Sequence, residues 1–491
     1  MTERPSRREM LTASLAGLTA VAGSYVAVGW SPTFVVAPVD QWIVNTTPGA
    51  ITTFMIENVG DAGHLLHIAM AVAAVLGLFG LVSFAGLRAG DRIGQPLVGG
   101  LVAGSVGWLL TVALTREPLL ALAAAGPMAV FTLVGGFQTE TGAINLRRRR
   151  TLGTVAGAVG FAGVAAITGR LLHGSEPLGD APNSEGADKR LAEAEASELD
   201  TASADLLGLV SPIDGFYNVD IAEFDPEVTS EEWSLTFTGD VEQERTIEFD
   251  DLIDREVENR FVTLRCVGED LNEQKLDNAA WTGTPLRPLL DSVDPQSDCD
   301  CAMLRGEDGY YVQFPTDVLA EGFLAWGMNG KELPTSHGHP VRVLIPGHWG
   351  ETNVKWLTEI ELLNTEEDGY WEERGWEGTG EVKTVAKLWD EGITELDDGR
   401  IELAGHAYAG TRGISRVEVS TDGGDSWVDA DLSEPLPDED VWRQWRYTFE
   451  PDGTHDVVVR ATDGEGNLQT EAETGSSPDG AAGWVERTVT E

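Results

Sequence analysis

The sequence predicts a multi-domain protein with N-terminal transmembrane α-helices, a central α+β domain and a C-terminal β-sandwich. Three observations predict this class. Long apolar stretches fill the first third of the 491 residues, the net charge changes sign near residue 170, and short alternating stretches separated by turn residues fill the C-terminal part. A chain of this length accommodates about three domains. We place the boundaries at 1–170, 171–209, 210–378 and 379–491.

Five uncharged or nearly uncharged stretches predict a membrane region in the first 170 residues. Each is long enough to cross roughly 30 Å of hydrocarbon as a helix. The stretches are Leu11–Trp30, Ala62–Leu87, Ile93–Thr115, Leu119–Phe137 and Thr151–Gly169.

The arginines between these stretches predict an orientation. With the N-terminus in the cytoplasm, nine fall on the cytoplasmic side: Arg4, Arg7, Arg8, Arg88, Arg92 and Arg147–Arg150. Only Arg116 and Arg170 fall outside. Because positive residues favour the cytoplasmic side, we expect a multi-pass protein of the cell membrane whose C-terminal part is extracytoplasmic.

Two histidines, His64 and His67, lie three residues apart near the outer end of the second stretch. Haem ligation within a helical bundle usually takes histidines from facing helices. We therefore interpret these two as interfacial histidines on one helix face. The helices then serve as an anchor, or as a docking surface for a quinone or partner, and not as a haem bundle.

Acidic side chains dominate everything that follows residue 170. Residues 1–170 hold 11 Lys and Arg against 8 Asp and Glu, whereas residues 171–491 hold 22 against 73, and the whole chain carries a net charge of −48. Such a surface repels nucleic acid, so we exclude a nucleic-acid partner. At molar salt the Debye length is about 3 Å and the self-repulsion is screened, so the composition indicates a halophilic protein.

Residues 171–209 are polar and acidic, which predicts a solvated linker with one short helix at most.

The region 210–378 mixes short strands and helical pieces, which is typical of an α+β fold. Strands are predicted at Trp233–Gly239, Arg260–Val267 and Val341–Pro346, and a short helix at Ile247–Asp254. No phosphate loop or dinucleotide fingerprint occurs in the sequence, which argues against NAD, FAD and ATP as cofactors.

The last region, 379–491, is almost entirely strand and turn, and regular short strands of this kind predict a β-sandwich. The predicted strands are Ile401–Ala407, Ile414–Ser420, Trp427–Asp431, Trp442–Phe449 and His455–Thr462.

The three cysteines are too few for a disulfide framework. Cys299 and Cys301 flank one residue, and because a bridge across so short a loop would be strained, we expect ordinary thiols. Cys266 ends a predicted strand and enters a glycine turn. Alone, such a residue is usually a small buried hydrophobe, although a thiolate there could bind a soft metal.

Blocks that reach well beyond Cys266 favour the metal. They are Ser211–Asp220, the Cys266 turn, Asn278–Leu290, Asp308–Tyr310, Trp326–Gly330, His337–Leu357 and Tyr370–Trp376. In order and spacing the chain from Ser211 to Thr470 resembles the sulfite oxidase family of molybdopterin oxidoreductases, in its membrane-attached bacterial and archaeal form. The resemblance implies a molybdenum–molybdopterin cofactor and an immunoglobulin-like C-terminal domain that often mediates homodimers.

The resemblance also implies the roles of particular residues. Cys266 stands where the family binds the metal, which two dithiolene sulfurs and oxo groups also ligate. Trp376 stands at the position of a substrate-side tyrosine. The terminal phosphate of the pterin requires cations and amide donors. The positions that match cofactor contacts are Tyr217, Asn218, Asp308, His337, Arg342, Asn353, Val354 and Lys355.

One departure from the family pattern concerns the substrate. Sulfite oxidases follow the cysteine with an amide and arginines, whereas this chain reads Val267-Gly-Glu-Asp-Leu271. Glu269 or Asp270 facing the metal would oppose a dianion by roughly 3 kcal/mol per pair of unit charges at about 6 Å, unless the side chains face solvent. We therefore expect two-electron oxygen-atom transfer on a substrate other than sulfite, such as neutral or cationic S-oxides, N-oxides or an organic sulfur compound.

Electron transfer and export complete the predicted function. Three cysteines cannot supply an iron-sulfur cluster, so a separate cytochrome, copper protein or quinone system is implied. Enzymes of such families acquire the pterin in the cytoplasm and must cross the membrane folded. Two twin-arginine candidates, Arg7-Arg8 and Arg149-Arg150, precede apolar stretches, although both also fit positive-inside clusters.

The alternative function is a membrane-anchored surface binding protein whose molybdopterin-like domain has lost its cofactor.

Overall fold

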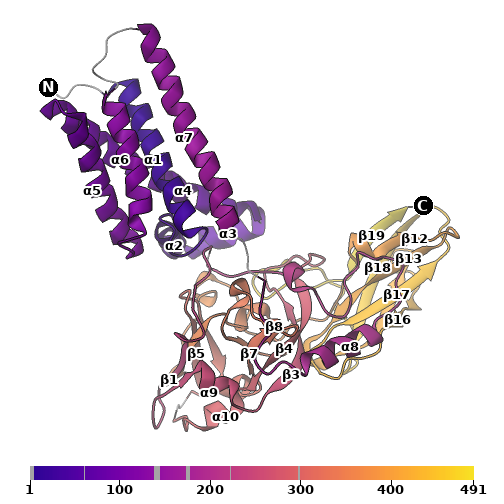
Figure 1. Cartoon of the computed structure of the whole chain (residues 1–491). Helices are drawn as coiled ribbons and strands as arrows, with labels where there is room; N and C mark the ends of the chain where they lie inside the picture. Colours follow the sequence, from indigo (N-terminus) through magenta and orange to yellow (C-terminus); the bar gives the residue numbers. More distant parts are fainter. Residues whose placement is uncertain are drawn as a thin grey trace. The chain divides into compact units, whose positions relative to one another are not determined.

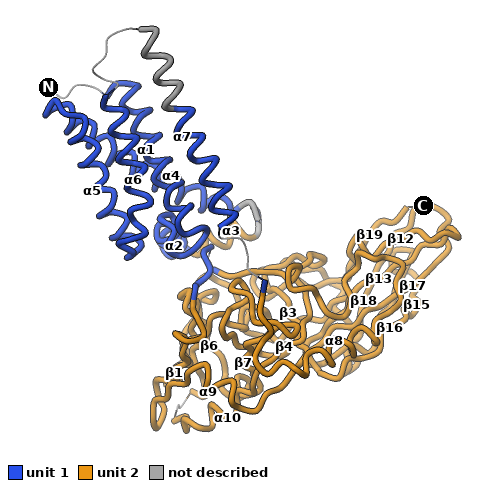
Figure 2. Tube along the Cα trace, in the orientation of Figure 1, with its two compact units in different colours: residues 1–48, 58–177, 221–227 blue, residues 49–57, 178–220, 228–491 orange. Residues whose placement is uncertain are grey.

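The computed structural model describes residues 5–59, 61–137, 144–172, 177–221, 223–296 and 299–490. The chain divides into two compact units. The first comprises residues 1–48, 58–177 and 221–227, and the second comprises residues 49–57, 178–220 and 228–491 (Figure 2). We call them the helical unit and the catalytic unit.

The helical unit is a bundle of long apolar helices packed side by side (Figure 1). All five predicted helices are present: α1 (Arg7–Val28), α4 (Asp61–Ile93), α5 (Pro96–Thr115), α6 (Ala121–Phe137) and α7 (Ile144–Leu172). Four of them contain a stretch long and apolar enough to cross a membrane, and the 17-residue α6 is shorter. A further helix that the sequence did not predict is α2 (Ala37–Thr46).

Small residues allow these helices to approach closely, as is typical of helix pairs in membranes. A Cβ added at Gly86 of α4 would lie 2.6 Å from the carbonyl oxygen of Gly99 in α5. Ser83 and Thr132 share a hydrogen bond of 2.7 Å between α4 and α6. The sequence therefore builds a bundle from backbone contact and buried hydroxyl pairs as well as from apolar side chains.

The predicted arginine and histidine features of this unit can be followed in part. Ser6 caps α1 in a capping box with Glu9, so the first twin-arginine candidate opens a helix. The side chains of the second candidate lie outside the described residues. His67 Nδ1 lies 2.8 Å from Oδ1 of the buried Asp40, which gives it a structural partner, whereas the side chain of His64 is outside the described part.

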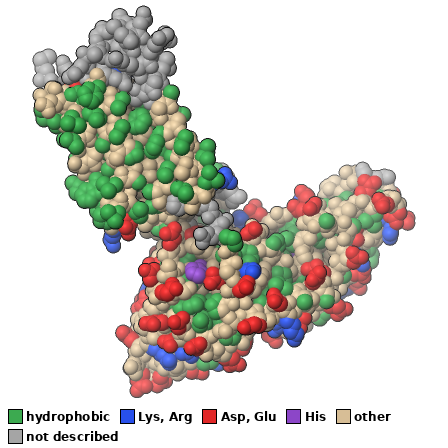
Figure 3. Space-filling model, in the orientation of Figure 1, with side chains coloured by type: hydrophobic (Ala, Val, Ile, Leu, Met, Phe, Trp, Pro, Cys, Tyr) green, Lys and Arg blue, Asp and Glu red, His purple; other side chains and the backbone are tan. Residues whose placement is uncertain are grey.

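The two units differ in their surfaces (Figure 3). Large apolar side chains are exposed along the bundle, for example Leu81 at 68% and Leu101 at 61%. Asp and Glu side chains are scattered over the visible face of the catalytic unit and outnumber Lys and Arg there (Figure 3). An exposed apolar surface of this extent is a feature of proteins that meet lipid or a partner.

The α+β part of the catalytic unit contains two sheets. The first has the order β2-β1-β10-β5-β6, with β1 and β10 parallel and the other neighbours antiparallel. Its strands are β1 (Ser234–Gly239), β2 (Arg245–Glu248), β5 (Cys301–Gly306), β6 (Tyr311–Pro315) and β10 (Leu357–Leu363). Three short helices accompany the sheets: α9 (Phe249–Ile253), α10 (Arg287–Asp291) and α11 (Thr316–Leu319).

The second sheet positions the candidate site. It has the order β3-β4-β7-β8, and β9 pairs with β7. Its strands are β3 (Glu258–Arg265), β4 (Leu276–Pro285), β7 (Phe323–Met328), β8 (Lys331–Glu332) and β9 (Arg342–Leu344). The three strands predicted in this region are confirmed. The helix predicted at Ile247–Asp254 begins two residues later, because Ile247 belongs to β2 and pairs with Leu235 of β1.

The C-terminal region is the predicted β-sandwich. One sheet has the order β11-β13-β17-β16 with β12 beside β13, and the other has the order β15-β14-β18-β19. Buried side chains of both sheets form its core, including Leu403, Trp445, Val417 and Val459. Its strands are β11 (Val385–Ala386), β12 (Ile393–Glu395), β13 (Ile401–Tyr408), β14 (Ile414–Ser420), β15 (Val428–Asp429), β16 (Asp431–Leu432), β17 (Arg443–Phe449), β18 (Thr454–Asp463) and β19 (Val485–Thr490).

Residues 178–209 differ from the solvated linker that the sequence predicts. The expected short helix is present as α8 (Ala187–Ser197), but Ala194 and Leu209 are buried in a core shared with Trp442. The backbone N–H of Leu199 donates to Gln444 Oε1 at 3.0 Å. The acidic charges occupy the exposed positions, and the interspersed alanines and leucines attach the segment to the β-sandwich.

Cys299 and Cys301 form a disulfide, contrary to the prediction of two thiols. The intervening Asp300 has a positive φ of 50°, and the two Cα atoms lie 5.3 Å apart, within the range that a disulfide requires. This leaves Cys266 as the free cysteine of the chain.

Candidate active site

Cys266 lies immediately after β3, where the chain leaves the second sheet. Its backbone N–H donates to the carbonyl of Lys275 at 3.0 Å, which closes the loop that follows. The thiol is half-buried. Burial, with the nearby Glu269 carboxylate, raises the pKa of the Cys266 thiol to about 12. A metal cation in place of the proton would remove this cost, since the thiolate is the form that binds metals.

Glu269, three residues beyond the cysteine, lies in a fully buried ion cluster. Its Oε1 accepts hydrogen bonds from Arg265 Nε at 2.7 Å and from Lys387 Nζ at 2.6 Å, and all three side chains are completely buried. The Glu269 carboxylate therefore points into this ion cluster and not to solvent, and its charge still acts on the Cys266 thiol. A buried carboxylate requires compensation, and two cations supply it. Asp270, the other acidic residue of this loop, is exposed.

The same cluster ties the cysteine loop to the C-terminal region. Arg265 donates to the carbonyls of Lys383 at 2.8 Å and Ala481 at 3.1 Å, and its guanidinium lies over the Trp349 ring at 4.8 Å. Sequence reasoning missed Arg265 and Lys387. Arg265 adjoins the cysteine, but nothing in the sequence connects Lys387 with it.

Arg342 begins β9 and is buried. It donates to the carbonyls of His337 at 3.2 Å and Asn353 at 2.9 Å, and its guanidinium lies over the Trp281 ring at 5.3 Å. Its Nε has no hydrogen-bond partner among the described residues. Burial lowers the pKa of Arg342 to about 10, so it stays charged at neutral pH and holds an unused donor.

Lys355 lies in the same cluster as Arg342. Its Nζ donates to Asn218 Oδ1, to Asp220 Oδ2 at 2.9 Å and to the carbonyl of Ser336 at 2.8 Å. The structure thus brings the predicted residues Asn218 and Lys355 into contact and adds Asp220. An anion that binds Lys355 would compete with the Asp220 carboxylate.

His337 and Asp308 lie beside these cations. Burial, followed by Lys355 and Arg342, lowers the pKa of His337 to about 3, so its ring is neutral. The ring packs edge-on against Phe216 at 5.5 Å. Burial and the carboxylate of Asp220 raise the pKa of Asp308 to about 6 although Lys355 opposes the shift, and Asp308 accepts the backbone N–H of Tyr310 at 3.0 Å.

Asn353 and Val354 are buried in the segment that leads to Lys355, and both help to hold it. The Asn353 side chain accepts the N–H of Ile345 at 2.7 Å and donates to the carbonyl of Trp349 at 3.1 Å. The Val354 carbonyl accepts the N–H of Val343 at 3.0 Å. The Asn353 side chain therefore fixes the loop, and its backbone carbonyl orients Arg342.

Tyr217 lies under the electrostatic influence of both Cys266 and Arg342. Its backbone N–H donates to Asp277 Oδ2 at 2.8 Å. Burial, with the charge of a Cys266 thiolate, raises the pKa of the Tyr217 hydroxyl well above its usual value, and Arg342 opposes this shift. The hydroxyl lies 2.5 Å from where a Cβ on Gly350 would stand, so the glycine leaves room for it.

Trp376 lies beside the cysteine loop, as the sequence predicts. A Cβ added at Gly268 would lie 3.7 Å from the Trp376 ring and 3.9 Å from Cys266 Sγ. The indole is 3% exposed, and its N–H has no partner among the described residues. Nearby, burial and the adjacent Glu372 carboxyl raise the pKa of Glu351 to about 8.

These residues fit a molybdenum cofactor. Cys266 offers a soft ligand for a soft metal. Arg342 and Lys355 offer positive charge for a phosphate. Buried N–H groups without partners in the described structure, on Arg342, Trp356 and Trp376, are donors that a polar ligand would satisfy.

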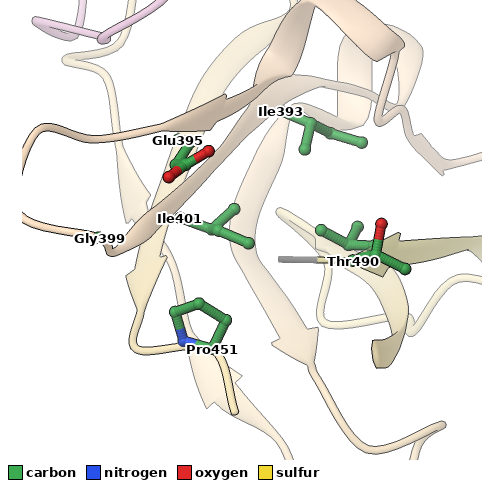
Figure 4. Close-up of a pocket in the computed structure, with 7 residues that line it drawn as sticks. Ile393, Glu395, Gly399, Ile401, Pro451 and Thr490 are labelled. Carbon is green, nitrogen blue, oxygen red and sulfur yellow. The ribbon is translucent and has the colours of Figure 1, made fainter. Parts of the chain in front are cut away.

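The lining of a hollow elsewhere in the catalytic unit contains no thiol and no cationic side chain. It lies in the β-sandwich, where Ile393, Ile401, Pro451 and Thr490 point towards one another around it and Glu395 supplies the titratable group (Figure 4). None of the predicted site residues lines it.

Comparison with protein families gives two matches. Residues 222–371 match an oxidoreductase molybdopterin binding domain, and residues 381–476 match a Mo-co oxidoreductase dimerisation domain. The first match contains Cys266, Asp308, His337, Arg342, Asn353, Val354 and Lys355.

Individual relatives are distant. A sulfite oxidase of Arabidopsis thaliana is 25% identical over 55% of this chain and 84% of its own length. The mitochondrial sulfite oxidase of Mus musculus is 28% identical over 46% of the chain and 51% of its length. A nitrate reductase of Beauveria bassiana is 30% identical over 46% of this chain and 30% of its own length. The solved sulfane dehydrogenase SoxCD from Paracoccus pantotrophus aligns at 19% identity and a TM-score of 0.49, over 58% of this chain and 82% of its own.

Proposed function

Because the chain belongs to the sulfite oxidase family of molybdopterin oxidoreductases, we propose that it is a membrane-anchored enzyme that transfers an oxygen atom and two electrons at a molybdenum centre held by Cys266. The observation that carries the proposal is the position of this free thiol. It lies immediately after β3, and its charge and that of Arg342 both act on the Tyr217 hydroxyl. In the oxidative direction the reaction is X + H2O → XO + 2H⁺ + 2e⁻, and reduction is the reverse.

The chain's own residues bind and orient. When bound, the cofactor supplies a metal that exchanges an oxygen atom together with two electrons. Cys266 would hold the metal, and the β3 backbone and the buried Arg265–Glu269–Lys387 cluster fix the cysteine loop. Arg342 would hold the phosphate end of the pterin. The N–H of Trp376, which has no partner among the described residues, would donate a hydrogen bond to an oxygen on the substrate side.

The preferred substrate is neutral or cationic, and its selection rests on the surroundings of Cys266. The strongest charges that act on this thiol are the carboxylates of Glu269 and Glu351 and the ammonium of Lys275. Glu269 is neutralised in its ion cluster, and the raised pKa of Glu351 keeps it largely protonated at neutral pH. The site therefore offers an indole and little positive charge for a sulfite dianion.

Anchoring, assembly and electron transfer extend the proposal. Four helices could span a membrane, and the arginine distribution favours an extracytoplasmic catalytic unit. The dimerisation-domain match supports a homodimer. The electrons pass to or from a separate carrier of the cytochrome, copper-protein or quinone class.

Metal and pterin analysis of the purified full chain tests the cofactor, and a substrate panel tests the specificity. We expect about one molybdenum and one pterin per chain, with faster turnover of neutral S-oxides or N-oxides than of sulfite. Rapid sulfite oxidation would refute the substrate assignment, and a chain free of molybdenum would refute the function.

A further inference from the structure

Helix α3 (Gly49–Val59) comes from the N-terminal part of the sequence, but most of it belongs to the catalytic unit. Residues 49–57 pack with that unit, although α2 and α4 on either side belong to the helical unit (Figure 2). Gly49, Thr53 and Ile56 follow the i, i+4, i+7 spacing and so share one face of the helix. This face carries the contacts with the catalytic unit.

The first two residues of this face attach α3 to Arg374. A Cβ added at Gly49 would lie 2.9 Å from Arg374 Cγ, so the glycine permits close approach. Thr53 Oγ1 donates to the carbonyl of Arg374 at 3.1 Å. Arg374 in turn donates to the carbonyl of Tyr370 at 2.6 Å, and its guanidinium lies 3.6 Å from the Tyr370 ring centre. The helix is thus fixed to the segment that carries Trp376.

Ile56, the third residue of the face, reaches the cysteine loop. A Cβ added at Gly268 would lie 4.0 Å from Ile56 Cγ2, 3.9 Å from Cys266 Sγ and 3.7 Å from the Trp376 ring. These three side chains therefore surround the same point. Ile56 is partly buried against the apolar cluster that includes Trp349 and Trp376.

The opposite face of α3 carries apolar residues that are more than half exposed. Ile51 and Phe54 are 53% and 57% exposed. Ile51 therefore provides a matched position: the same residue type on the same helix, turned away from the cysteine.

We propose that α3 is a lid over Cys266 and that Ile56 is a specificity-determining residue, which restricts the site to small uncharged substrates. An anion that passes Ile56 and Trp376 would lose hydration against two apolar side chains. The specificity part of this inference rests on the proposed function, whereas the shielding of the thiol does not.

Thiol labelling of the full chain tests the lid without an activity assay. Cys266 is the free cysteine, because Cys299 and Cys301 are paired, so mass spectrometry reports one site. In protein from molybdate-starved cells, we expect Ile56→Ala to accelerate labelling by a bulky maleimide about tenfold. Ile51→Ala should leave the rate unchanged. Equal rates in Ile56→Ala and wild type, or equal acceleration by both variants, would overturn the lid.

A conservative variant guards against misfolding. Ile56→Leu keeps the volume, and it should retain the slow labelling of the wild type. If Ile56→Leu labels as fast as Ile56→Ala, the position senses general loosening and the lid assignment fails.

The molybdenum-loaded protein tests the specificity. We expect Ile56→Ala to lower KM about tenfold for bulkier or anionic substrates, including sulfite, while kcat for the small neutral substrate stays within about twofold. An unchanged substrate ranking would overturn the specificity role. If labelling shows shielding but the wild type contains no molybdenum, the proposed function fails and the lid stands.

Discussion

The carboxylate of Glu269 lies between two buried cations, three residues from Cys266. Replacing it with glutamine would leave Arg265 and Lys387 buried without an acidic partner. Breaking a buried ion cluster in this way costs roughly 3–5 kcal/mol. We expect Glu269→Gln to lower the unfolding free energy of the catalytic unit by that amount. Denaturant unfolding followed by tryptophan fluorescence measures it, since twelve of the fifteen tryptophans lie after residue 177.

Lys387→Met is the control for this prediction. It retains the Arg265–Glu269 pair, and burial already lowers the pKa of Lys387 to about 8 although the charge of Glu269 opposes this. The variant should therefore lose much less stability than Glu269→Gln. Equal losses in the two variants would contradict the account of the cluster.

Single residues show what sequence reasoning can reach. The eight predicted cofactor positions and Cys266 follow from short motifs. The structure places five of these positions in one connected cluster: Tyr217, Asn218, His337, Arg342 and Lys355. The orientation of Glu269 could not be predicted, because Lys387 lies 118 residues away. Ile56 could not be predicted for the same reason: an apolar helix next to a membrane region gives no sign that it lies against the Gly268 turn that follows Cys266.

Among the elements, the short 3-10 helix Gly350–Thr352 controls the space around Tyr217. A Cβ on Gly350 would stand 2.5 Å from the Tyr217 hydroxyl and 3.1 Å from the carbonyl oxygen of Arg265. We expect Gly350→Ala to displace Tyr217 and to reduce the molybdenum content of the purified protein about tenfold. Gly380→Ala, where no atom lies within 4 Å of the added Cβ, should bind molybdenum like the wild type. Full occupancy in Gly350→Ala would show that Tyr217 does not position the cofactor.

The contact between β3 and the β-sandwich contains a buried acid. Asp440 Oδ1 accepts the Tyr408 hydroxyl at 2.6 Å, the Asp440 carbonyl accepts the N–H of Thr263 at 2.9 Å, and Asp440 Oδ2 has no partner in the described structure. Burial raises the pKa of Asp440 to about 7. The native state therefore binds a proton that the unfolded chain releases near its ordinary pKa of about 3.9.

The free energy of unfolding should accordingly fall as the pH rises from about 4 to about 7. Because the native pKa is the higher one, the contribution of Asp440 is complete below about pH 4 and lost above about pH 7. Between pH 5 and 8 we expect a loss of roughly 2–3 kcal/mol. Asp440→Asn should flatten this part of the profile, measured by denaturant unfolding at each pH. A variant with the wild-type slope would assign the pH dependence to another group.

The elements differ in how well the sequence predicts them. The apolar helices and four of the five predicted strands of the β-sandwich appear where the sequence indicates. The fifth, Trp427–Asp431, is divided between β15 and β16 in different sheets, and β11, β12 and β19 were not predicted. The strands β4, β5, β7 and β10 were not predicted, because buried central strands lack the polar alternation that marks a half-exposed strand. In residues 178–209 the acidic composition concealed the few buried alanines and leucines that pack on the β-sandwich.

For the whole molecule, the net charge of −48 predicts a stability that depends on salt. Self-repulsion between surface carboxylates weakens as the Debye length falls from about 10 Å at 0.1 M to about 3 Å at 1 M. We expect the thermal unfolding temperature of the solubilised chain to rise between 0.1 M and 2 M KCl. A temperature that stays constant or falls would count against a halophilic protein.

The central claim is that Cys266 ligates molybdenum, and X-ray absorption at the molybdenum edge tests it most directly. In the wild-type chain we predict three sulfur ligands, two from the pterin dithiolene and one from Cys266. In Cys266→Ser we predict that the molybdenum either is absent or has two sulfur ligands, together with the loss of oxygen-atom transfer. A Cys266→Ser protein with full molybdenum, an unchanged sulfur shell and wild-type turnover would contradict the account.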